Sequence, residues 1–247
     1  MKINAKYLTF DLIENSLEIN DWLKQFNFND RYYAKLLLTQ LQFISRDDFS
    51  YWLLDKLKNY ISLNCAIYSV RKFKKKGEDN LWFGNEDILS RPAKTMGSED
   101  FVSSIISNAN RNYNNCFVDH PKLNELRDKK IHNIILLDDS IGSGHRISDF
   151  MKRIFNNKTF LSWWSGGFIN IHILSYARTI QSEKFILDNI PGSNKGKSIN
   201  NIVKKIKFDS EIVYDVTKIE KRWGSESPKI ILLCNSIIQI NEDRRKG

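Results

Sequence analysis

The run of residues 134–146, Ile-Ile-Leu-Leu-Asp-Asp-Ser-Ile-Gly-Ser-Gly-His-Arg, constrains the fold more than any other part of the chain. Its four consecutive branched apolar residues predict a strand that is buried on both faces, as in a parallel sheet. Two aspartates stand at the end of this strand, and a Gly/Ser turn leads into apolar residues at helical spacing from Ile147 to Phe155. This order predicts a ligand site at the carboxyl edge of an α/β sheet.

The turn has the chemistry of a phosphate site. Gly142 and Gly144 allow close backbone approach, Ser143 adds a hydroxyl, and the start of the following helix carries partial positive charge. Asp138 and Asp139 would repel a phosphate, and they are better suited to sugar hydroxyls or to a nearby metal ion. The alternative interpretation is a strand, turn and helix with a purely structural role.

At these residues the chain resembles the type I phosphoribosyltransferases, whose signature is four apolar residues, two acids and a small-Thr-Gly-Gly-Thr loop. The resemblance implies that Asp138 and Asp139 hold the ribose hydroxyls of phosphoribosyl pyrophosphate. The 5-phosphate would be held by the loop residues Gly142, Ser143, Gly144, His145 and Arg146. Two positions depart from the signature, because His145 stands where glycine is usual and Arg146 replaces the closing threonine. An arginine there could pair with the phosphate as a bidentate cation, or it could fill the pocket.

A second loop-to-helix junction lies at residues 91–98, where breaker residues precede a helix predicted over residues 99–109. In the resembled family, a loop after the first core strand holds the pyrophosphate. By position, the resemblance assigns this leaving-group role to Lys94, Gly97 and Ser98, and Arg178 after a later strand is a further candidate. The alternative is a capped helix without a ligand. The resemblance also implies Mg²⁺, brought by the ligand, which neutralises the departing charge.

The remaining patterns predict an α/β fold with a mostly parallel sheet and an N-terminal helical lobe, and the resemblance implies that this sheet is of the phosphoribosyltransferase type. Strands are expected at residues 65–70, 81–83, 115–118, 134–137, 168–176, 212–216 and 230–233. Helices are expected at residues 20–26, 33–44, 49–60, 99–109, 123–130, 147–155 and 180–186. Asn29 or Asp30 would cap the second helix, and Ser45 with Asp48 the third. We divide the chain into a helical lobe at residues 1–62 and an α/β domain at residues 63–247.

The formal net charge of +9 implies attraction to an anionic partner. Basic clusters at residues 72–76, 195–197 and 204–207, with Phe73 and Phe208 among them, could bind single-stranded nucleic acid. The alternative is that these lysines are ordinary solvated surface. Three widely spaced cysteines indicate reduced thiols in a cytoplasmic protein. No run of about 18 apolar residues occurs, so no membrane span is expected.

The helical lobe, the strand at residues 64–70 and the Asp-Asp-Ser-Ile-Gly-Ser-Gly loop together are similar to the phosphoribosyltransferase-like proteins of bacterial conflict systems. Some of these accompany retron reverse transcriptases in anti-phage defence. The resemblance implies a toxic or regulatory effector that is held in check by partner proteins such as a reverse transcriptase.

Two functions remain open. The first is an enzyme that transfers a phosphoribosyl group or cleaves a nucleotide glycosidic bond. The second is a non-catalytic module that senses a phosphoribosyl or nucleotide ligand, or that docks protein or nucleic acid. The altered end of the loop favours the second function. So does the short connection between residues 118 and 134, which is too short for the closing loop that catalytic relatives usually have.

Overall fold

The computed structural model describes residues 6–72, 80–83, 87–88, 98–113, 116–190 and 206–244. The chain forms two compact units. The α/β unit is Phe49–Tyr214, and the terminal unit joins Met1–Asp48 to Asp215–Gly247. The terminal unit is therefore discontinuous in sequence, with the α/β unit between its two segments. The division expected at residue 62 is a different partition of the chain and stays a prediction.

The α/β unit is built on a five-stranded parallel sheet with the strand order β6-β3-β7-β8-β9. Its strands are β3 (Cys65–Ser69), β6 (Phe117–Asp119), β7 (Asn133–Ile141), β8 (Asn170–Thr179) and β9 (Ile206–Tyr214). The runs of branched apolar residues in β7 and β8 are buried on both faces, as expected for parallel strands covered by helices. The predicted α/β fold is confirmed. A short antiparallel pair, β4 (Trp82–Phe83) and β5 (Asp87–Ile88), also belongs to this unit.

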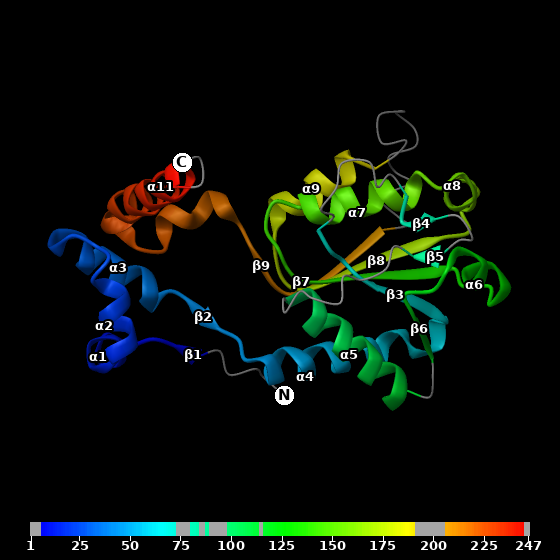
Figure 1. The fold of residues 1–247 in the computed structure, drawn as a ribbon, viewed down its shortest axis with the longest axis horizontal. Coiled ribbons are helices and arrows are strands. Elements are labelled where there is room, and N and C mark those ends of the chain that lie inside the picture. Colours follow the sequence, from blue (N-terminus) through cyan, green and yellow to red (C-terminus); the bar gives the residue numbers. More distant parts are fainter. Residues whose placement is uncertain are drawn as a thin grey trace. The chain divides into compact units, whose positions relative to one another are not determined.

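Helices cover both faces of this sheet (Figure 1). On one face lie α7 (His145–Phe155), α8 (Lys158–Ser165) and α9 (Ile180–Asp188), and on the other lie α4 (Arg46–Leu57) and α5 (Ser98–Asn112). The connection from β6 to β7 contains α6 (Leu123–Asp128), and η2 (Lys58–Leu63) leads from α4 into β3. Under α7 the main core contains Ile134, Leu136, Phe150 and Ile154, each no more than 1% exposed. Burial of such side chains contributes about 1.5–3 kcal/mol each to stability.

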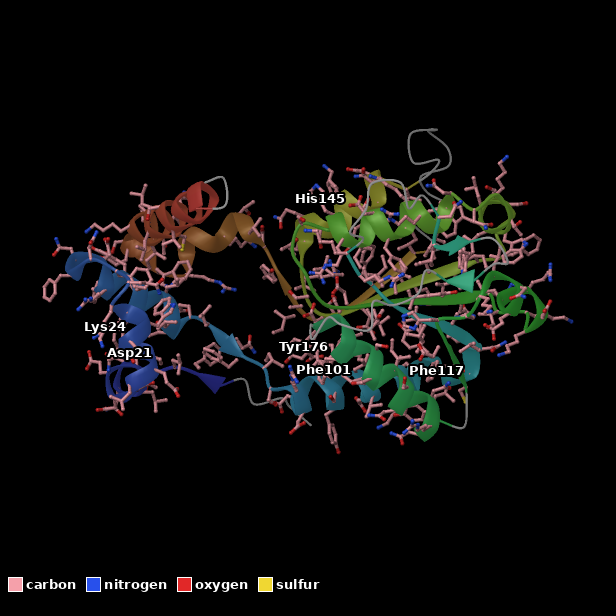
Figure 2. All side chains as sticks on the ribbon, viewed as in Figure 1. Asp21, Lys24, Phe101, Phe117, His145 and Tyr176 are labelled. Atoms are coloured by element: carbon pink, nitrogen blue, oxygen red, sulfur yellow. The ribbon has the colours of Figure 1, made fainter. Side chains whose placement is uncertain are left out.

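The opposite face of the sheet is packed with aromatic side chains. Tyr176 of β8 contacts Phe49 and Trp52 of α4, with ring centroids 6.2 and 5.2 Å apart. Phe49 also lies 5.8 Å from Phe101 of α5, and Figure 2 labels Tyr176 and Phe101 on this side of the sheet. This packing fixes α4 and α5 over the strands that carry the site described below.

The terminal unit contains helices from both ends of the chain. Its elements are β1 (Lys6–Tyr7), α1 (Phe10–Asn15), α2 (Leu17–Leu23), η1 (Phe28–Asp30), α3 (Arg31–Thr39), β2 (Gln42–Phe43), η4 (Val216–Lys221), η5 (Gly224–Glu226) and α11 (Ser227–Arg244). The core of this unit joins Ile13, Leu23, Phe26 and Leu38 to Leu233 of α11. Trp223 Nε1 donates to Leu36 O at 3.2 Å, which adds a second link between the two segments.

The strand predicted at residues 230–233 is wrong, because these residues lie in α11. A run of four apolar residues does not by itself distinguish a strand from a helix. The burial pattern has the helical period, since Ile230 and Leu233 are 1% and 7% exposed whereas Leu232 is 67% exposed. β3, β6, β7 and β8 lie within a few residues of their predicted positions, whereas β9 begins six residues before the start predicted at residue 212.

The helix starts were predicted with mixed success. Ser45 Oγ accepts the N–H of Asp48 at 3.0 Å, which confirms the predicted cap of α4. In contrast, Asp30 makes no side-chain cap bond to α3, and a 3₁₀ turn precedes that helix instead. The helix expected at residues 20–26 begins earlier, after Ser16, whose Oγ accepts from Ile19 N. Among the described residues, none of the helices is both long and apolar enough to cross a lipid bilayer.

Candidate ligand-binding site

The candidate site lies where the chain changes direction across the sheet. From β3 the chain passes through α5 to β6 on one side, and from β7 it passes through α7 and α8 to β8 on the other. These two connections cover opposite faces, and ligands of open α/β sheets bind beyond the carboxyl ends of two such strands. A cavity of about 470 Å³ lies at this point. It is lined by Arg71 and Lys72 after β3, by the end of β7 with its loop, and by one side of α7.

The predicted phosphate loop lines this cavity with all of its proposed residues, Gly142, Ser143, Gly144, His145 and Arg146. Gly144 has a φ of 85°, and an added Cβ would lie 3.0 Å from Ser182 O, so this position requires glycine. Gly144 is also the N-cap residue of α7 and has no side chain to cap it, and the one side-chain contact described for the first-turn N–H groups is the long bond from His145 N to Ser143 Oγ at 3.5 Å. An uncapped first turn has N–H groups and a positive dipole end that suit an anion.

Two contacts hold the loop against β8 and α9. Thr179 Oγ1 at the end of β8 donates to Gly142 O at 2.7 Å and accepts from Ser182 N at 2.9 Å. The His145 ring lies against Phe185 of α9, with centroids 4.3 Å apart, and its Nδ1 lies 2.9 Å from Ser143 Oγ. Figure 2 labels His145 at the first turn of α7. The bulky residue that replaces the usual glycine therefore packs against a neighbouring helix.

The acidic pair and the loop are joined by an ion pair. Arg146 Nη1 lies 2.9 Å from Asp138 Oδ1 and 3.9 Å from Asp139 Oδ1. Burial raises the pKa of the Asp138 carboxyl to about 8, although Arg146 beside it lowers that pKa. Among the described residues, the cavity lining includes Asp138 but leaves out Asp139. The Asp139 carboxylate is partly exposed and accepts the N–H of Ser140 at 2.8 Å.

Of the leaving-group residues proposed from the sequence, Arg178 alone has a described side chain, and it is not part of the described cavity lining. Lys94 and Gly97 lie outside the described residues, and so does the side chain of Ser98, whose backbone begins α5. Arg178 Nη1 lies 2.7 Å from Glu183 Oε2, and its guanidinium lies 5.4 Å from the Phe208 ring centroid. These contacts place Arg178 in the packing between β8, β9 and α9.

Sequence reasoning missed three cations that line the cavity, namely Arg71, Lys72 and Arg153. A signal for each was present in the sequence. Arg71 and Lys72 directly follow the strand predicted at residues 65–70, and Arg153 stands seven residues after Arg146 on the same side of a predicted helix. The lysine clusters at residues 74–76 and 195–205 lie outside the described residues.

A family model described as PRTase-CE matches residues 19–234. The chain belongs to the PRTase-CE family. The match includes the signature strand, its loop and most of both structural units, so the predicted phosphoribosyltransferase-like character is confirmed. No curated protein and no solved structure matches the chain.

In this PRTase-CE protein the charge of the cavity favours an anionic ligand. Among the described residues, four cationic side chains line it, Arg71, Lys72, Arg146 and Arg153, against the carboxylate of Asp149 and the carboxyl group of Asp138, whose raised pKa reduces its negative charge near neutral pH. Arg146 and Arg153 are separated by about 10 Å along α7 at 1.5 Å per residue. The positive lining therefore extends well beyond the phosphate loop, which suits a ligand with more than one anionic group.

Proposed function

We propose that this PRTase-CE protein binds a ribose 5-phosphate ligand, either phosphoribosyl pyrophosphate or a nucleotide, in the cavity beyond β3 and β7. The observation that carries the proposal is the presence of Asp138 and the uncapped first turn of α7 in one cavity, joined by Arg146. A carboxylate accepts hydrogen bonds from ribose hydroxyls, while backbone N–H groups and a guanidinium donate to a phosphate. This arrangement supports Asp138 as a ribose residue and residues 142–146 as the 5-phosphate loop, and Asp139, which lies outside the described cavity lining, is proposed as the second ribose residue.

The pyrophosphate end of the ligand is proposed to meet Arg71 and Lys72, which enter the cavity directly after β3. Lys94, Gly97, Ser98 and Arg178 remain part of the proposal as further leaving-group residues. Mg²⁺ is proposed to arrive with the ligand, because this ion is held by one or two carboxylates together with phosphate oxygens. The exposed Asp149 carboxylate lines the cavity and would supply one such ligand. When bound, the ion would neutralise charge on the departing pyrophosphate.

The proposed chemistry is transfer of the phosphoribosyl group to an acceptor, or cleavage of a nucleotide glycosidic bond. In either reaction the bond from ribose C1 to the leaving group breaks, and positive charge develops on the sugar. The protein would act by orienting the ribose and by stabilising the charge of the leaving group. The presence of Arg71 and Lys72 in the cavity lining supports the proposal that they perform the second task.

The biological role that we propose follows from the resemblance to effectors of bacterial conflict systems. In this role the protein is a cytoplasmic toxic effector of anti-phage defence, associated with a reverse transcriptase of a retron. Its net charge of +9 supports a nucleic-acid component in such an assembly. Co-purification of the protein with a reverse transcriptase and its RNA tests this part of the proposal.

A second candidate function is a non-catalytic module with the same fold that senses the ligand or docks protein or nucleic acid. The ion pair between Arg146 and Asp138 favours it, because this pair occupies a carboxylate that a ribose would need. A bound ribose would then replace Arg146 as the partner of Asp138, and the release of Arg146 would change the conformation of the loop.

Calorimetry with phosphoribosyl pyrophosphate, ribose 5-phosphate and unphosphorylated ribose tests the proposed function. We expect affinity to rise in the order ribose, ribose 5-phosphate, phosphoribosyl pyrophosphate. Chromatography of each bound ligand then shows whether it is converted. Binding without conversion supports the sensing module, and the absence of binding by all three refutes the ribose-phosphate site.

A further inference from the structure

A chain of hydrogen bonds lies at the carboxyl ends of β3 and β6. It includes Ser69, which is two residues before Arg71. His120 directly follows β6, and its Nε2 lies 2.9 Å from Ser69 N and 3.2 Å from Ser69 Oγ. Its Nδ1 contacts one oxygen of the Asp119 carboxylate, and the other oxygen accepts from Ser107 Oγ of α5 at 3.3 Å. His120 has a φ of 47°, which is costly for a residue other than glycine and marks a constrained position.

These contacts fix the tautomer of His120. A backbone N–H only donates, so Nε2 must accept from Ser69 N, and Nδ1 carries the proton that it donates to Asp119. A role for Ser69 as an activated nucleophile is excluded on the same ground. The lone pair that would remove its hydroxyl proton already accepts the Ser69 N–H, and Ser69 is only 7% exposed.

The His120 imidazole takes the place of a missing strand partner. In the parallel pairing of β3 with β6, the last residue of β6 is Asp119, which lies opposite Ile67. Alternate N–H groups of a central strand face opposite neighbours, so Val70 N donates to Leu137 O of β7 at 2.8 Å while Ser69 N faces the β6 side. His120 accepts this N–H beyond the end of β6. It therefore extends the pairing of β3 up to the point where Arg71 and Lys72 enter the cavity.

We propose that His120, oriented by Asp119, is a positioning residue that fixes residues 69–72 and so determines where Arg71 and Lys72 lie in the cavity. The part of this inference that concerns the ligand rests on the proposed function, in which these two cations meet the pyrophosphate end. The contacts of His120 described above are with Ser69 and Asp119, and neither residue belongs to the phosphate loop. Its loss should therefore affect one end of the ligand and leave the 5-phosphate end unchanged.

The first test needs no ligand and uses His120→Gly in the full chain. Glycine adopts the φ of 47° without strain and leaves room for added imidazole, which can restore the acceptor. We expect hydrogen exchange of residues 69–72 to be about tenfold faster in this variant, since one partly buried hydrogen bond is lost. Added imidazole should slow it again, and residues 142–146 should exchange as in the wild type.

His132→Gly is the matched control. It removes an exposed imidazole just before β7, at the end of that strand away from the cavity. There, the His132 Nδ1 atom lies 3.0 Å from Phe168 O. Exchange of residues 69–72 should be unchanged in this control, with or without imidazole. A second variant, Asp119→Asn, keeps the His120 ring but no longer enforces its tautomer, and it should also speed exchange at residues 69–72. Unchanged exchange there in both His120→Gly and Asp119→Asn overturns the proposal, whatever the ligand is.

The second test uses calorimetry on the same variants. His120→Gly should bind phosphoribosyl pyrophosphate about tenfold more weakly than the wild type and bind ribose 5-phosphate equally well, with the loss reversed by imidazole. Equal losses of affinity for both ligands would show that His120 has a general structural role, and would count against its role in positioning Arg71 and Lys72. A wild-type protein that binds neither ligand would refute the proposed function, while the exchange experiment would still decide the role of His120.

Discussion

Arg146 Nη1 and Asp138 Oδ1 lie 2.9 Å apart, so the first turn of α7 is tied to the end of β7 by an ion pair inside the cavity. The two partners differ in environment, because the Asp138 side chain is 4% exposed and that of Arg146 is 40% exposed. Arg146 can therefore turn toward water or toward a bound anion, whereas Asp138 has to remain in the interior. The first two predictions follow from this difference.

We predict that Asp138 makes the protein less stable as the pH rises. Its pKa of about 8 in the fold exceeds the ordinary value of 3.8, so the folded protein keeps a proton that the unfolded chain releases between these values. The free energy of unfolding should fall over this range by up to about 1.4 kcal/mol per pH unit from this group. Urea denaturation should show that slope in the wild type and a shallower one in Asp138→Asn. Parallel curves for the two proteins would contradict the prediction.

Arg146 should contribute to the binding of a phosphorylated ligand. A guanidinium has enough donors to keep one bond to Asp138 and to make another to a 5-phosphate. Arg146→Ala should weaken ribose 5-phosphate by about tenfold to a hundredfold, corresponding to roughly 1.5–3 kcal/mol, and leave ribose almost unaffected. The affinity of Arg146→Lys for ribose 5-phosphate should lie between those of the wild type and Arg146→Ala, because an ammonium cannot bridge two acceptors with the same fixed geometry. Stronger ribose 5-phosphate binding by Arg146→Thr would show instead that the arginine blocks the site.

The two glycines of the loop should differ in their tolerance of alanine. Gly144 has a φ of 85° and would place a Cβ 3.0 Å from Ser182 O, whereas a Cβ on Gly142 meets nothing within 4 Å. Gly144→Ala should therefore lower the free energy of unfolding by about 1–3 kcal/mol, and Gly142→Ala should change it by less than about 0.5 kcal/mol. Chemical denaturation of both variants measures this difference. Similar losses at both positions would argue against the described loop conformation.

Asp139 should matter for the ligand and not for the fold. Its carboxylate is partly exposed, and the backbone bond that it accepts from Ser140 N can also be accepted by an amide oxygen. Asp139→Asn should unfold at the wild-type denaturant concentration, yet bind ribose 5-phosphate about tenfold more weakly because a charged acceptor of ribose hydroxyls is lost. Calorimetry gives the affinity. Wild-type binding by this variant would leave Asp138 as the one carboxylate of the pair that meets the sugar.

The local part of the site could be predicted from the sequence because its signals are local. Branched apolar residues before Asp138, and glycines before a helical repeat, are sufficient to place a strand, a loop and a helix. All five proposed phosphate residues do line one cavity with Asp138. The α/β class also follows from alternating strand and helix patterns.

The rest depends on which strands become neighbours, and no short segment encodes that. Arg71 and Lys72 reach the cavity only because β3 lies beside β7, and His120 meets Ser69 only because β6 lies on the other side of β3. Residues 230–233 were predicted as a strand for a similar reason. The apolar side of this part of α11 packs into the core of the terminal unit, which is formed by residues far away in the sequence. Such contacts link residues that are tens to hundreds of positions apart.

The discontinuous terminal unit has a consequence for synthesis on the ribosome. Residues 1–48 emerge first, but their core is completed by Leu233, and Leu36 O receives the Trp223 side chain. The apolar sides of α1–α3 must therefore wait until residue 233 has been translated, about ten or more seconds later at elongation rates of roughly 5–20 residues per second. The contiguous α/β unit has all of its own residues available earlier. A released chain truncated after residue 214 should accordingly hold a protease-resistant sheet and a protease-sensitive N-terminal segment.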